Sequence, residues 1–189
     1  MIAGALLLGC APAIQRADLG PALVDVKGHA AEIAAARPTK LVFRSPKARV
    51  HVFANDLING DHHLTFGSAR GTLFVDRASG RGLLHLDVAM EVVRAENAFI
   101  TDFASRMLEV HAFPHAILDA TFEPIEGEPN RKLVTGNLLL HGVERRIRFR
   151  ADLEPQGSGM NFRAVFDMSR SAFGIHARAE EGEGIIRDD

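Results

Sequence analysis

The sequence has one cysteine and neither tryptophan nor tyrosine. A single cysteine cannot form an internal disulfide, so the class of small disulfide-stabilised domains is excluded. Phenylalanine supplies all 12 aromatic side chains, which predicts an interior without the polar groups that tyrosine and tryptophan bring. The formal net charge of −2 argues against nucleic acid as a partner, because binding to a phosphate backbone requires a basic surface.

Long apolar runs are also missing. The apolar run at residues 2–9 is far shorter than the roughly 20 residues of a membrane-spanning helix, but it is typical of a signal-peptide core. It ends in Leu7-Leu8-Gly9-Cys10, the pattern of a bacterial lipobox, in which the chain is cut before a cysteine that becomes lipidated. No basic residue precedes the run, so the alternative is an apolar N-terminus with a chance cysteine.

The sequence divides into three parts. We expect a lipoprotein signal peptide at residues 1–9, a lipid-anchored tether at residues 10–40 and a β-barrel domain at residues 41–189. The tether is rich in alanine and proline, with a short helix expected over residues 30–36. The final strand of the barrel domain is expected to be incomplete, because the chain ends soon after Ile175.

Residues of the third part alternate between apolar and polar, as in strands with one dry face. The clearest case is 146–153, where Ile147, Phe149, Ala151 and Leu153 alternate with arginines and an aspartate. Similar patterns run through 47–53, 64–76, 84–92, 116–123, 132–140 and 160–168, with turn signals between them. Many one-sided strands joined by short turns predict an all-β fold with an antiparallel sheet, as a barrel or a sandwich.

One segment has the period of a helix instead. Asn97 is a suitable N-cap, and Phe99, Phe103 and Met107 follow it as one apolar stripe, with Ile100 and Ala104 beside it. We expect this short amphipathic helix to cap one end of a barrel.

Three stretches resemble the YceI-like family, which is described as lipid- or polyisoprenoid-binding-like. They are the hairpin at 134–143 with the following 146–149, the segment 166–175 containing Arg170-Ser171-Ala172-Phe173-Gly174, and the segment 107–114 with its strand. The resemblance covers about 41–175. It implies a lipocalin-like antiparallel β-barrel of about eight strands, exported to the periplasm, which holds an isoprenoid chain and is not an enzyme.

The apolar faces of the strands supply the candidate ligand-binding residues. On the resemblance, the inward side chains line a cavity for a lipid; the alternative is a solid core, which any small barrel also needs. The candidate lining residues are Phe66, Leu86, Val88, Met90, Leu118, Phe122, Leu138, Ile147, Phe149, Phe162 and Phe166.

Other chemistry finds little support in the sequence. None of the nine histidines belongs to an H-x-x-x-H motif on a predicted helix or has a cysteine partner, and no serine lies in a G-x-S-x-G motif. We predict no catalytic residues, metal or cofactor. Arg145, Arg146, Arg148 and Arg150 invite phosphate binding, but alternation favours placing them on the outer face, where they keep the barrel soluble.

The sequence therefore favours a binding protein for an isoprenoid-type lipid, a polyprenyl phosphate or a quinone. Its predicted place is the periplasmic face of the outer membrane, which the alanine after Cys10 favours by analogy with enterobacterial sorting. The alternative is a structural or assembly lipoprotein, with a solid barrel that binds another protein. No feature identifies a protein partner.

The lipobox predicts that Cys10 anchors the mature chain. Each buried acyl CH₂ contributes about 0.8 kcal/mol to membrane binding, so two or more chains give a stable anchor. Expression from the natural start and membrane fractionation should place the wild type in the membrane and Cys10→Ser in the soluble fraction. Equal solubility of the two would rule out the anchor.

Overall fold

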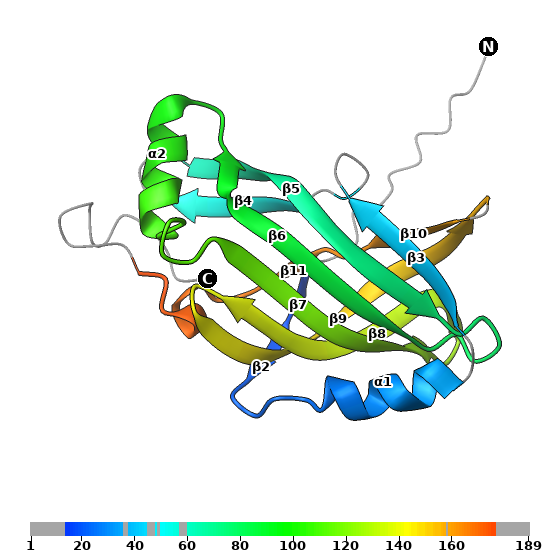
Figure 1. The fold of residues 1–189 in the computed structure, drawn as a ribbon. Helices are drawn as coiled ribbons and strands as arrows, with labels where there is room; N and C mark the ends of the chain where they lie inside the picture. Colours follow the sequence, from blue (N-terminus) through cyan, green and yellow to red (C-terminus); the bar gives the residue numbers. More distant parts are fainter. Residues whose placement is uncertain are drawn as a thin grey trace, which may run out of the picture.

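The computed structural model describes residues 14–35, 38–44, 48, 50–56, 60–157 and 159–176. The predicted signal peptide and Cys10 lie outside these residues. Five long consecutive strands form the antiparallel centre of the fold (Figure 1). They are β5 (Gly60–Val75), β6 (Gly82–Arg94), β7 (His115–Ile125), β8 (Glu128–Leu140) and β9 (Val143–Gln156).

Shorter strands extend both edges of this meander. β3 (Thr39–Arg44) and β4 (Val50–Asp56) pair with different halves of β5. On the other side, β2 (Asp18–Gly20) and β10 (Gly159–Arg163) pair with different parts of β9. None of the strand pairs among the described residues joins β10 to β3. We call the space between these two edges, from β3 to β10, the seam.

The strands send alternate side chains to one interior, as the sequence predicts. In β9, Ile147, Phe149, Ala151 and Leu153 are buried while Arg148 and Arg150 are exposed. The interior contains two apolar clusters. The lid cluster lies beside α2 (Ala98–Met107) and includes Phe66, Val88, Met90 and Phe173; the far cluster includes Leu118, Phe122, Ile147 and Phe149.

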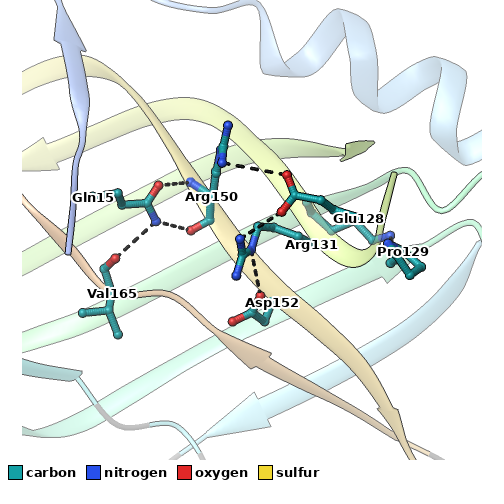
Figure 2. A network of polar contacts seen from close by, with 8 residues as sticks. Gln15, Glu128, Pro129, Arg131, Arg150, Asp152 and Val165 are labelled. Atoms are coloured by element: carbon teal, nitrogen blue, oxygen red, sulfur yellow. Dashed lines mark hydrogen bonds and ion pairs between the residues drawn. The ribbon is translucent and has the colours of Figure 1, made fainter. Parts of the chain in front are cut away.

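Part of the predicted tether belongs to the folded domain. β2 pairs antiparallel with β9, while β1 (Gln15–Arg16) pairs in parallel with β11 (Phe166–Asp167). The side-chain amide of Gln15 makes hydrogen bonds to the backbone of β9 and of Val165, as a neighbouring strand would (Figure 2). Its Oε1 accepts from the Arg150 amide at 2.7 Å, and its Nε2 donates to the carbonyls of Arg150 at 2.5 Å and Val165 at 3.2 Å.

A second side-chain amide holds the same segment on the outer face of the sheet. Asn137 of β8 accepts a hydrogen bond from the Val24 amide at 2.8 Å and donates to the Val24 carbonyl at 2.9 Å. The helix α1 (Val26–Ala35) follows directly, beginning and ending earlier in the chain than the expected helix at 30–36. Asn137 thus fixes the point from which α1 runs along the sheet.

Helix α2 covers one end of the barrel, as predicted, with part of the predicted apolar face turned inward (Figure 1). Asn97 caps it as expected, accepting from the Ile100 amide at 2.9 Å. Ile100 and Ala104, expected beside the stripe, are the buried residues of the helix, and Met107 of the stripe packs against the lid cluster. Phe99 is 70% exposed, so the prediction is wrong for this residue. The helix has two adjacent apolar stripes with four-residue spacing, and the smaller one, formed by Ile100 and Ala104, is the buried one. Neither α1 nor α2 is long and apolar enough to cross a membrane.

The amide of Asn137 should contribute measurably to stability, because it satisfies both polar groups of one partly buried peptide position. Asn137→Ala is expected to lower the free energy of unfolding by about 1–3 kcal/mol in urea denaturation. Asn137→Asp keeps the acceptor for the Val24 amide and should lose less. An Ala variant as stable as the wild type would show that this contact does not hold the segment.

Candidate functional site

The eleven sequence-predicted lining residues all lie in or against the two clusters. Phe66, Val88 and Met90 are buried in the lid cluster; Leu118, Phe122, Ile147 and Phe149 are buried in the far cluster; Leu86 and Leu138 contact both; Phe162 and Phe166 pack on the far cluster. The structure therefore gathers them on the inner face of one barrel. Which of them would contact a ligand stays a prediction.

Two of these residues mark a band where the packing is looser. On β6, Leu84 and Val88 are 4% and 5% exposed, but Leu86 between them is only partly buried. On β8, Leu138 is likewise more accessible than Val134 and Leu140 on either side. Leu86 and Leu138, like Leu19 and Met168, touch both clusters, so the accessible band lies where the clusters meet.

Accessible apolar side chains also gather along the seam. Those that pack on the far cluster while keeping some exposure are Leu41, Phe43, Met160, Phe162, Ala164, Phe166 and Met168, from β3, β10 and the segment around β11. The Phe166 ring stacks on buried Phe149, with centroids 4.4 Å apart and planes inclined by 26°. The side of the interior nearest the seam is thus apolar and incompletely covered.

A second candidate region surrounds the turn between β8 and β9. Leu140 and Val143 pair across a two-residue turn, in which His141 and Gly142 both have positive φ, at 52° and 73°. This is the type I′ geometry, which suits the right-handed twist of the strands and favours Asn-Gly over most dipeptides. The turn directs the His141 ring toward the end of the barrel that α2 covers.

The imidazole of His141 connects three segments that are distant in the sequence. Its Nε2 lies 3.0 Å from the Glu109 carboxylate after α2, and its Nδ1 lies 3.3 Å from the carbonyl of Phe173 in η1 (Ser171–Phe173). The Phe113 ring packs against it at 4.3 Å between centroids. Since both partners are acceptors, only the doubly protonated ring donates both hydrogen bonds at once.

These contacts bring together the three stretches that carry the family resemblance. Phe173 is fully buried in the lid cluster, and Gly174 after it has a φ of 69°, which favours glycine. A cavity of about 260 Å³ lies beside this junction. It is lined by Arg106, Met107, Glu109, His141, Gly174 and His176. A second cavity, of about 480 Å³, lies outside the N-terminal half of α2. None of the predicted lining residues borders either cavity.

The arginines of β9 do not share one face. Arg146 and Arg150 point outward, where they reach Asp18 at 3.0 Å and Glu128 at 3.8 Å. Arg145 pairs with Leu138 in the β8–β9 register, next to the inward pair Gly136 and Ile147. The expectation that Arg145 lies on the outer face is therefore wrong, because its odd number gives it the parity of the buried residues.

Histidines outside the junction make pairs on the outer surface. His85 lies 2.7 Å from Asp119, and His115 lies 2.7 Å from Asp87, which also accepts from Arg70. Burial acts to raise the pKa of Asp87, but the hydrogen bonds from Arg70 and His115 outweigh it and hold the pKa below its ordinary value. No group of three or more metal-ligating side chains occurs within the described part of the chain.

Comparison with known proteins agrees with this architecture. A family model described as the YceI-like domain matches residues 43–189. The chain belongs to the YceI-like family. Its fold is similar to the crystal structure of Burkholderia cenocepacia BcnA, with a TM-score of 0.64 and 19% identity over 73% of this chain and 89% of BcnA. This confirms the predicted lipocalin-like antiparallel barrel. No curated protein sequence matches the chain.

The junction at His141 should contribute to stability through its imidazole rather than through the turn alone. His141→Asn keeps a residue that tolerates positive φ but removes both hydrogen bonds, so the free energy of unfolding should fall by about 1–3 kcal/mol. His85→Asn, which removes an exposed histidine–aspartate pair, is the matched control and should change it by less than about 1 kcal/mol. Equal effects of the two variants would contradict a special role for the junction.

Proposed function

We propose that this YceI-like protein binds an apolar isoprenoid-type lipid, such as a polyprenyl phosphate or a quinone, inside its β-barrel. The observation that carries the proposal is the incompletely covered apolar lining between the two clusters and along the seam. A linear apolar chain lying there would remove this surface from water, and burial contributes about 25 cal/mol per Å². Family membership supports the same ligand class. The proposal assigns no catalytic step to the protein.

The barrel is proposed to work at a membrane. Cys10 would carry the lipid anchor, and the protein would then face the periplasm from the outer membrane. Strand β1 begins at Gln15, five positions after Cys10, and β2 follows it. A folded domain that starts a few residues after the anchor would be held near the bilayer surface, where polyprenyl lipids reside.

A structural or assembly lipoprotein remains the second candidate. It is favoured by the close packing of both clusters, in which Phe122, Phe173, Ile147, Val93 and Val134 are almost completely buried. A barrel filled in this way could serve as a rigid platform for another protein. The two candidates differ in whether the purified barrel carries or takes up a lipid.

Native mass spectrometry of the purified barrel, followed by titration with a polyprenyl phosphate and with a quinone, tests the choice directly. The carrier proposal expects a lipid adduct or saturable uptake. Absence of both, together with core-like destabilisation by every inward truncation, would favour the assembly candidate.

Truncation of the stacked pair Phe149 and Phe166 separates lining from core. Phe149→Ala removes a buried side chain and should cost about 3–5 kcal/mol in denaturation experiments. Phe166→Ala, at a partly exposed site, should cost less but weaken lipid binding or change the preferred chain length. Val42→Ala, at a side chain 73% exposed on β3, is the control and should alter neither property. Unchanged lipid binding by Phe166→Ala would remove that residue from the site.

A further inference from the structure

Arg145 lies on the inner face of the barrel. The β8–β9 register places it opposite Leu138, between the inward pairs formed by Gly136 with Ile147 and by Leu140 with Val143. Cross-strand partners lie on the same face of a sheet, so the Arg145 side chain leaves its strand on the apolar side. Its neighbours in sequence, Glu144 and Arg146, have the opposite parity.

The same register extends this position into a row across the barrel wall. Leu138 pairs with Leu118 on β7, and Leu118 pairs with Leu86 on β6. Gly71 on β5 completes the row opposite Leu86. Arg145 is the charged end of an otherwise apolar row, and two members of that row, Leu86 and Leu138, form the accessible band between the clusters.

The guanidinium of Arg145 is oriented but not neutralised. Its Nε donates to the Ala172 carbonyl at 2.8 Å, which ties β9 to η1. Its two terminal amino groups have no hydrogen bond or ion pair with any residue that the structure describes. By contrast, Arg146 and Arg150 on the outer face of β9 each have a carboxylate partner.

We propose that Arg145 binds the anionic head of the ligand, so that the barrel selects a polyprenyl phosphate over a neutral quinone or alcohol. This inference rests on the proposed function. The two terminal amino groups of an oriented arginine match the oxygens of a phosphate with two parallel hydrogen bonds. The apolar row would contact the hydrocarbon chain of such a lipid, and the guanidinium of Arg145 at its end would bind the anionic head.

A second inward cation provides an internal comparison. Lys132 of β8 has the same parity as Val134 and is 7% exposed. Its Nζ donates to the Pro129 carbonyl at 2.8 Å, beside the β7–β8 hairpin. Lys132 pairs with Ala151 of β9, six residues beyond Arg145, so the two cations lie at different levels of the barrel.

The test compares a polyprenyl phosphate with the uncharged polyprenol of the same chain length. The affinity of the full protein for each lipid is measured by isothermal titration calorimetry. The wild type should bind the phosphate about 10- to 100-fold more tightly, the range expected for charge-assisted hydrogen bonds. Arg145→Gln should lose this ratio while keeping its affinity for the polyprenol. Arg145→Lys, which keeps the charge but not the fork, should retain part of the ratio.

Arg148→Gln removes an exposed, outward arginine of the same strand and should leave the ratio unchanged. A purely structural role for Arg145 would weaken phosphate and polyprenol equally, and this result would overturn the proposal. An unchanged preference for the phosphate in Arg145→Gln would also overturn the proposal. If Lys132→Gln abolishes the preference instead, Lys132 and not Arg145 binds the head group. If the wild type binds the polyprenol without preferring the phosphate, the head-group inference alone fails; if it binds neither lipid, the proposed function fails with it.

Discussion

The turn between β8 and β9 requires two consecutive residues with positive φ, and the end of the barrel beside α2 is arranged around it. Gly142 meets this requirement without strain, whereas His141 adopts a backbone conformation that few side chains favour. Glu109, its carboxylate partner, also has a positive φ, at 45°. Strained positions persist where their surroundings compensate them, and here the compensation is the set of contacts made by one imidazole.

This junction joins the three separated stretches that carry the family resemblance. The hairpin supplies His141, the segment after α2 supplies Glu109 and Phe113, and η1 supplies the carbonyl of Phe173. Phe173 in turn fills the lid cluster. The conformation of the turn, the position of the helical lid and the packing of the interior are therefore mutually dependent.

Alternation in the sequence predicts most of the barrel because most inner-face residues of the long strands obey a period of two. It breaks at the register shift between Phe66 and Ser68, where the buried residues of β5 change from Leu64 and Phe66 to Ala69 and Leu73. It fails at the N-terminal segment, where β2 is three residues long and β1 only two, so neither carries a readable pattern. Their position depends on the side chains of Gln15 and Asn137, which act over 135 and 113 residues of sequence. Local propensity contains no information about such partners.

The candidate site was predictable to a similar extent. The inward apolar residues follow directly from the alternation along each strand. If the alternating pattern of β9 is extended by one residue, from Arg146 to Arg145, it places Arg145 on the inner face. The run of arginines obscured it, because Arg145 begins a series whose other members face outward. The pair formed by His141 and Glu109 could not be read from the sequence, since the partners are 32 positions apart and the strands β7 and β8 lie between them.

The bonds of Gln15 also bear on the order in which the chain assembles. Of the strands in the described residues, β1 leaves the ribosome first; it pairs with β11, the last of them, and Gln15 bonds to the middle of β9. Closing so long a loop carries an entropic cost that is recovered only when both partners are in place. The segment that carries β1 therefore cannot dock before β9 and β11 have been synthesised, and until it docks, the backbone of β9 at Arg150 is an unpaired edge open to water and to other chains.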